Sequence, residues 1–463
     1  MLIPLIVACA LFMENLDSTV LATSLPAIAQ AFGESPLKLN LAITSYLFAL
    51  AVFIPISGWM ADRFGTRTVF RAAIIVFTVG SILCGISESF WELVGARVLQ
   101  GMGGAMMAPV GRLLVIRSTS KSELVRAMAF LMLPALLGPV IGPPLGGFLT
   151  TYLSWRWIFW INVPIGIIGV ILVSIYIPNT RAASVPPLDY SGFLLSSLSL
   201  LGLVFGFETI GRDLMPAWIS SGLMVGGAIG LWLYLRHARR TEYPVLDFRL
   251  LQVQTFRVSV TAGTLFRIGV GAIPFLLPLM LQVGFGLSAF QSGMLTFASA
   301  VGALAMKTTA APILRRFGFR RVLLANAVIS GGFIAILGFF RPDWPAWVIL
   351  GLLLVGGFFR SLQFTAMNTI VYADIPPERM SAATSFYAMA QQVTLSAGVA
   401  VGAMVLHITA TLAGDRALVP GDFTPAFVAV GLAAMCSVLL LRPLPKNAGE
   451  ELSGHRLPPP KLP

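Results

Sequence analysis

The chain has 463 residues, of which 57% are hydrophobic and only 11% are charged, and its mean hydropathy is +0.87. A soluble protein of this length needs far more charge to cover its surface, so the composition excludes that class and indicates an all-α polytopic membrane protein. The net charge of +12 would also suit nucleic acid, but membrane topology explains the basic residues better, and we expect no nucleic-acid partner.

Apolar runs separated by polar breaks predict fourteen membrane spans, each close to the ~17–25 residues that cross hydrocarbon as a helix. The N-terminus lacks a basic region and a small-residue cleavage site, so we expect it to be the first span and not a signal peptide. The predicted spans cover residues 4–25, 41–61, 69–87, 92–116, 128–150, 155–177, 188–207, 217–236, 256–282, 288–313, 321–340, 346–372, 381–407 and 424–442.

The loops that follow even-numbered spans are rich in Lys and Arg, whereas the loops after odd-numbered spans hold few. This asymmetry predicts that both termini face the cytoplasm. Cysteines and histidines are scattered, so we expect no metal site and no cofactor beyond a proton gradient.

A weak internal repeat relates two parts of the chain, because "DRFGTR" at 62–67 and "RRFGFR" at 315–320 share Arg-Phe-Gly-x-Arg. Each follows the second span of a six-span block, which predicts two pseudo-symmetric bundles with a site between them. We expect an N-terminal bundle, two inserted helices, a C-terminal bundle and a disordered cytoplasmic tail at 1–180, 181–240, 241–442 and 443–463.

Two acidic residues interrupt the first span, in "MENLDSTVLATSLP" (13–26). Glu14 and Asp17 lie three residues apart and would share one face of a helix. An ionisable group in a span usually faces a cavity or a partner, and a buried carboxyl group beside a second acid can exchange a proton in the physiological range. Both are candidates for proton coupling; the alternative is that one acid only satisfies an arginine or a polar cluster.

Basic residues also lie inside spans. Arg267 and Arg360 fall near the middle of the ninth and twelfth spans, where guanidinium groups could hold an anionic substrate. The repeat offset relates Glu14 to Arg267, so these two could pair across a central cavity. Arg112, nearer the end of the fourth span, is a further candidate for the substrate route. Asn368 and Gln391 are candidate polar groups of the cavity.

Two Gly-rich stretches are candidates for gating. In "GWMADRFGTR" (58–67), Gly58 would allow close helix approach, while Asp62 among arginines could lock and release two helices; the alternative is a plain basic turn. In "GPVIGPPLGG" (138–147), we favour a bent, tightly packed helix at a moving interface over static packing. The candidate gating residues are Gly58, Asp62, Arg63, Gly65, Arg67, Gly138, Gly142, Pro143, Gly146 and Gly147.

These motifs resemble those of the major facilitator superfamily. "GWMADRFGTR" resembles its loop signature, "RVLQG" (97–101) its fourth-span Arg signature, and 138–147 its antiporter signature. "LDSTVLATSLP" (16–26) and "WRWIFWINVPIG" (155–166) are similar to signatures of the fourteen-span drug:proton antiporter branch. Within it, "GGAMMAPVGRLLV" and "RRFGFRRVL" look most like the MdtD-like multidrug exporters of enterobacteria.

The resemblance implies the major facilitator fold, a bacterial inner-membrane location, outward export driven by proton entry, and support of proton transfer by Arg97. It departs from the pattern at Arg315, which occupies the Asp position of the second repeat, so gating is expected to be asymmetric. We expect a monomer in membrane lipid whose partners are protons and a small-molecule substrate. The resemblance favours amphipathic drugs, whereas the two central arginines favour a small organic anion such as citrate or its metal complex.

A membrane-embedded enzyme is disfavoured, because no nucleophile–base pair, metal spacing or phosphate loop is present in the sequence. A channel is disfavoured by the two-half plan and by the charges within spans.

Overall fold

The computed structural model describes residues 2–118, 124–182, 185, 187–209, 216–376, 379–414 and 418–453, and these form helices and connections without any strand. The α-helices are α1 (Leu2–Phe32), α2 (Asn40–Phe64), α3 (Thr66–Ile86), α4 (Phe90–Ser118), α5 (Leu124–Tyr152), α6 (Trp157–Trp160), α7 (Asn162–Tyr176), α8 (Tyr190–Thr209), α9 (Ala217–Ala238), α10 (Gln254–Leu279), α11 (Ala289–Phe317), α12 (Phe319–Leu337), α13 (Ala346–Ile370), α14 (Met380–Leu412), α15 (Phe423–Leu441) and α16 (Glu450–Ser453). Short 3₁₀ turns cover Phe248–Gln252 and Pro420–Asp422, and a π-helical turn, Met280–Gly284, extends α10.

Thirteen helical segments of the described chain are long and apolar enough to cross a membrane, with α6 and α7 forming one of them. The remaining predicted span, 128–150, falls within α5. Several helices outrun the predicted spans, as α1 does by continuing to Phe32, because a helix keeps its backbone hydrogen bonds beyond the hydrocarbon. The predicted all-α membrane fold is confirmed.

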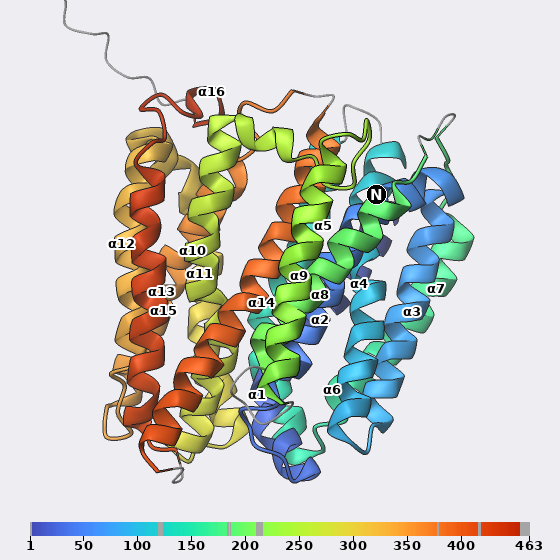
Figure 1. Cartoon of the computed structure of the whole chain (residues 1–463). Helices are drawn as coiled ribbons and strands as arrows, with labels where there is room; N and C mark the ends of the chain where they lie inside the picture. The colour runs from blue at the N-terminus through green and yellow to red at the C-terminus, as the bar shows by residue number, and fades with distance from the viewer. Residues whose placement is uncertain are drawn as a thin grey trace, which may run out of the picture.

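The helices form two bundles with matching contacts (Figure 1). In the first bundle α1 packs on α5, and α3 packs on α4 and α7; in the second, α10 packs on α14, and α12 packs on α13 and α15. The inserted α8 and α9 pack on each other, and α8 also contacts α2 and α14. We call the end of the molecule where Leu2 and α16 lie the termini side, at the top of Figure 1, and the other end the far side.

The two bundles meet through α5 with α11 and through α2 with α14. On the far side the Phe290 amide donates to Thr151 Oγ1 (3.1 Å), and its ring contacts the rings of Phe148 and Tyr152. Gln282 Nε2 also donates to the Thr23 carbonyl across the bundles, at 2.8 Å. The far side is therefore held together by direct contacts between the halves.

The segment that follows α15 is ordered, contrary to the prediction of a disordered tail from 443 onward. Leu444 is buried, Arg320 donates to the Arg442 carbonyl (3.2 Å), and Gln254 donates to the Pro443 carbonyl (2.7 Å). Composition suggested disorder, but an apolar anchor and two backbone carbonyls tie 442–444 to the bundle. Residues 454–463 of the predicted tail lie outside the described residues.

Candidate functional site

The centre of the first bundle holds an ion pair between two of the predicted proton-coupling residues. Asp17 on α1 and Arg97 on α4 are joined by Oδ2 and Nη1 at 2.6 Å, and each side chain is only 1% exposed. Arg97 Nε also donates to the Ala42 carbonyl (3.2 Å), and its guanidinium lies over the Tyr46 ring, 4.3 Å from the centroid. A buried ion pair needs such additional partners to offset the desolvation of both charges.

Three further polar side chains complete this cluster. The other carboxylate oxygen, Asp17 Oδ1, accepts hydrogen bonds from Gln100 Nε2 (2.8 Å) and Asn162 Nδ2 (2.9 Å). The Ser81 hydroxyl accepts from the same two amides, at 2.6 Å and 3.0 Å. Both oxygens of Asp17 are thus occupied by donors from α4 and α7.

The sequence prediction did not include Gln100, Asn162 or Ser81 among the functional residues. Gln100 and Asn162 stand within "RVLQG" and "WRWIFWINVPIG", so the motifs contained them without showing what they bind. Their signal was polarity inside apolar spans, because a buried amide or hydroxyl requires a hydrogen-bond partner.

Glu14 does not pair with Arg267, and that prediction is wrong for this structure. Glu14 is half-buried and its Oε2 makes no hydrogen bond to any described residue. Arg267 is 1% exposed, and its guanidinium lies over the Tyr387 ring of α14, 4.6 Å from the centroid. None of its nitrogens meets a hydrogen-bond acceptor in the described part of the chain. The repeat relates the two positions by symmetry, but Arg267 faces α14 and not α1.

Arg267, Asn368 and Gln391 come together around Tyr387. The Tyr387 hydroxyl donates to Asn368 Oδ1 at 3.0 Å, and Gln391 Nε2 donates to the same oxygen at 2.8 Å. Arg112 is exposed on α4, in the first bundle. These predicted substrate residues therefore lie on both bundles, with the larger group in the second.

Arg360 lies apart from that group, in a cavity of about 260 Å³ between the bundles. The predicted single site with both central arginines is therefore not what the structure contains, because Arg267 does not line this cavity. The Arg360 guanidinium donates to the Ser299 hydroxyl. The other lining residues come from α1, α5, α10 and α11: Ser18, Thr19, Ala22, Thr23, Pro143, Ile273, Pro274, Leu277, Pro278, Thr296, Ala300 and Ala303.

The predicted gating loop lies on the termini side, and Asp62 there pairs with Arg117 at the end of α4 (2.5 Å). Gly65 has a φ of 96°, which only glycine adopts readily, and a Cβ there would collide with Asn179. The Arg67 guanidinium donates to the Ile177 carbonyl at 3.4 Å, so the segment after α7 supports the loop.

One residue of this loop, Gly58, has a different surrounding from the one expected. Gly58 was expected to allow close helix approach, but nothing lies within 4 Å of where its Cβ would stand, so close packing does not explain this glycine here. Arg63 is exposed.

The Gly-rich stretch of α5 is tightly packed, a feature that a moving interface and static packing share. A Cβ on Gly138, Gly142 or Gly146 would collide with α1 at residues 15–16, 19 and 20–23 respectively. Gly147 instead faces the backbone of Ala289 and Phe290 on α11, and Pro143 lines the central cavity. One stripe of α5 thus fits against the helix that carries Asp17, and the neighbouring positions touch the other bundle.

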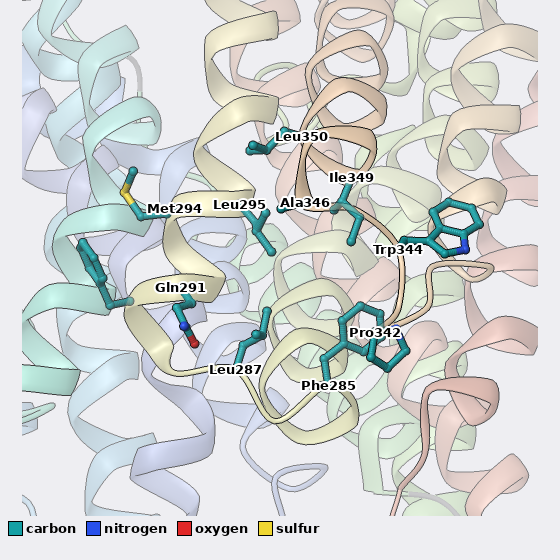
Figure 2. A pocket seen from close by; sticks show the side chains of 11 residues that line it. Phe285, Leu287, Gln291, Met294, Leu295, Pro342, Trp344, Ala346, Ile349 and Leu350 are labelled. Atoms are coloured by element: carbon teal, nitrogen blue, oxygen red, sulfur yellow. The ribbon is translucent and has the colours of Figure 1, made fainter.

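A second, apolar cavity of about 410 Å³ lies on the far side, against the contact between the bundles. Figure 2 shows its walls, with Gln291, Met294 and Leu295 of α11 on one side and Trp344, Ile349 and Leu350 on the other. Phe290 lines this cavity and also contacts α5. Gln291 contributes an amide and Trp344 an indole N–H, and the other described lining side chains are apolar.

Comparisons of the sequence with a family model and with known proteins indicate the same family. Residues 7–253 and 259–463 match the model of the Major Facilitator Superfamily. The chain is 40% identical over 407 residues to the "Putative multidrug resistance protein MdtD" of Serratia proteamaculans (strain 568), covering 87% of this chain and 84% of the relative. It is 39% identical over 407 residues to the protein of the same name from Salmonella heidelberg (strain SL476), covering 87% and 85%.

Solved structures agree with the fold. An auto-inhibited POT family peptide transporter superposes with a TM-score of 0.68 at 17% identity, covering 100% of this chain and 98% of the other. A D-xylose-proton symporter gives 0.68 at 15% identity, covering 95% and 96%. At such identities the likeness concerns the fold alone.

Proposed function

The chain belongs to the Major Facilitator Superfamily and is a multidrug-type transporter rather than an enzyme; from this premise, we propose that it is a proton-coupled antiporter. In this proposal it exports amphipathic small molecules by alternating access and takes up protons in return. The basic loops support an orientation with both termini in the cytoplasm, and the bacterial relatives support an inner-membrane location.

The buried pair of Asp17 and Arg97 is the observation that carries proton coupling. An ionised Asp17 holds α1 to α4 through Arg97, at 2.6 Å and with both side chains buried. Protonation removes the negative charge, so the pair weakens and α1 is free to move relative to α4. Because the α5 glycines fit against α1, a shift of α1 reaches α5 and its contact with α11.

Substitution of Asp17 by Asn tests this role. The variant retains an acceptor for Gln100 and Asn162 but cannot exchange a proton, so we expect loss of efflux driven by a pH gradient while folded protein remains in the membrane. The assay is dye efflux from proteoliposomes with an imposed gradient. Glu34→Gln is the control, because Glu34 forms a partly exposed pair with Lys38 and should tolerate the change. Wild-type efflux by Asp17→Asn would remove Asp17 from the coupling site.

A second candidate function is export of a small organic anion such as citrate or its metal complex. It is favoured by Arg267 and Arg360, neither of which has a carboxylate partner among the described residues. Efflux of a labelled polycarboxylate and of a cationic dye, measured in Arg267→Gln and Arg360→Gln, separates the two candidates. An anion exporter loses polycarboxylate efflux in these variants, whereas a cation exporter retains dye efflux because a repulsive charge is gone.

A further inference from the structure

The cavity between the bundles presents donors for which the described chain supplies no acceptor. Arg360 has five N–H donors, and its recorded hydrogen bond goes to the Ser299 hydroxyl. The Ser299 hydroxyl oxygen accepts that bond, and the Ser299 hydroxyl proton is not donated to any described residue. Arg360 and Ser299 therefore present unused N–H and O–H groups together at one wall. Two converging donors, one of them cationic, are what a carboxylate requires.

The other hydroxyl groups of the cavity are already committed as donors. Ser18 and Thr19 both donate to the Asn15 carbonyl, at 2.9 Å and 3.0 Å. Thr23 donates to the Val20 carbonyl (2.9 Å) and Thr296 to the Ser292 carbonyl (3.1 Å). No carboxylate is among the described residues that line the cavity, and Asp17 is turned into its pair with Arg97. Within the described lining, the charge is therefore that of Arg360 alone.

The wall formed by α10 is apolar. Ile273, Pro274, Leu277 and Pro278 line it, and the prolines have no N–H to offer a polar ligand. The volume of about 260 Å³ is just below the range of ~300–1,000 Å³ that ligand sites usually span. The cavity thus suits a small ligand with one acidic end and an apolar body.

We propose that this cavity binds a small amphipathic organic anion, with its acidic group on Arg360 and Ser299 and its apolar body against α10. The proposal rests on the proposed function as an exporter and names the substrate class. It disfavours lipophilic cations, which would meet the Arg360 charge, and hydrophilic polyanions, which would leave the α10 wall without an apolar partner. Because α1 and α5 of the first bundle also line the cavity, a ligand here touches both halves.

Three probes with the same ring system test the charge preference: 2-naphthoate, 2-naphthamide and 2-naphthylmethylammonium. Equilibrium binding is measured on the full chain in nanodiscs at neutral pH without a proton gradient, with empty nanodiscs as background. We expect naphthoate to bind about tenfold more tightly than naphthamide, and the ammonium probe most weakly. Labelled citrate, in the same assay, should bind more weakly than naphthoate.

Variants then show which residue causes the preference for naphthoate over naphthamide. Arg360→Gln should weaken naphthoate binding about tenfold while naphthamide binding stays within about twofold, which also reports a folded cavity. Arg360→Lys should retain part of the preference, and Arg341→Gln, on the α12–α13 connection, should change nothing. Equal binding of the three probes, or an unchanged preference in Arg360→Gln, overturns the proposal. So does loss of the preference in Arg267→Gln instead, because the anion would then lie at Tyr387.

The two proposals can fail independently. Wild-type efflux by Asp17→Asn would reject proton coupling, but it would not affect the naphthoate measurement, which uses no proton gradient. Gradient-driven dye efflux with no naphthoate preference would reject the substrate class and leave the exporter in place.

Discussion

Asp17 and Arg97 are each buried at a cost that the other offsets. Removing a charge from water costs several kcal/mol, and removing one partner of a buried pair leaves the other uncompensated, which typically costs about 3–5 kcal/mol. The amides of Gln100 and Asn162 reduce this penalty on the Asp17 side, where each donates to Oδ1. The pair is thus stable as an ion pair and sensitive to the loss of either charge.

Replacing Arg97 by Ala should destabilise the protein by about 3–5 kcal/mol, because Asp17 would keep a buried negative charge without its cation. The double variant with Asp17→Asn should recover part of that loss, since no buried charge is left. Thermal unfolding in detergent measures both. If the double variant were as unstable as Arg97→Ala, lost packing of the Arg97 side chain, and not the unpaired charge, would account for the effect.

Sequence reasoning identified Asp17 and Arg97 separately but could not place them in contact, because they lie on different helices. For Glu14 and Arg267 the sequence reasoning went wrong in the opposite way. It paired two residues that are not in contact, because the repeat relates their positions. A repeat says which residues occupy equivalent places in two bundles, not which side chains face each other. Facing depends on how each helix is rotated about its axis, and the surrounding helices set that rotation.

At the scale of single helices, glycines differ in how closely a neighbouring helix packs on them, and those of α5 pack closely on α1. Gly142 has no room for a Cβ, because one would overlap the Thr19 side chain, whereas Gly58 on α2 has open space. Gly142→Ala should therefore destabilise the protein by about 1–3 kcal/mol through overpacking. Gly58→Ala should change stability by no more than about 0.5–1 kcal/mol and in the favourable direction, since alanine is the better helix former.

Thermal unfolding and gradient-driven efflux of both variants provide the test. Equal stability of the two alanine variants would contradict the close α1–α5 fit. Reduced efflux by Gly58→Ala at unchanged stability would point to a second conformation in which Gly58 is packed.

For the loop between α2 and α3, we expect a substitution to affect the balance between conformations more than stability. Asp62 and Arg117 are 34% and 28% exposed, and pairs of this kind contribute about 1 kcal/mol or less. Asp62→Asn should therefore leave unfolding almost unchanged. A difference of ~1 kcal/mol still changes a two-state ratio about fivefold, so the balance between conformations should shift toward opening on the termini side.

Crosslinking between the termini-side ends of the two bundles measures this balance. Arg63→Gln is the matched control, because Arg63 is an exposed residue of the same loop. An unchanged distribution in Asp62→Asn would reduce the loop to a determinant of topology.

For the whole molecule, the sequence predicted the helices and the two bundles but not the cavity between them. Length and apolarity identify a span because lipid demands an apolar helix with all its backbone bonds made internally. The same requirement makes a span apolar on all sides, so little in its pattern tells which face meets another helix. Arg267 and Arg360 therefore could be assigned to the membrane centre, while their separation into a Tyr387 group and a cavity required the packed structure.

The far-side contact between the bundles provides a test of alternating access as a property of the whole molecule. Phe290 of α11 contacts the rings of Phe148 and Tyr152 of α5, with centroids 6.4 Å and 5.8 Å away. Each aromatic pair contributes about 0.5–1.5 kcal/mol beyond burial, so Phe290→Ala should remove ~1–3 kcal/mol from the far-side-closed state. That loss would raise the ratio of far-side-open to closed molecules about 5- to 150-fold.

Spin labels at Leu153 and Trp347 can report this change, because both side chains are strongly exposed, at 59% and 74%, and belong to different bundles on the far side. With the native cysteines replaced, pulsed distance measurements should show a longer component in Phe290→Ala. Phe333→Ala is the matched control: Phe333 stacks on Phe359 at 5.8 Å within the second bundle, so its loss removes a ring pair without loosening the contact between halves. A rocking motion about the central cavity requires that only the Phe290 variant gain the long distance. If both variants or neither did so, the contact of α5 with α11 would not be the element that closes the far side.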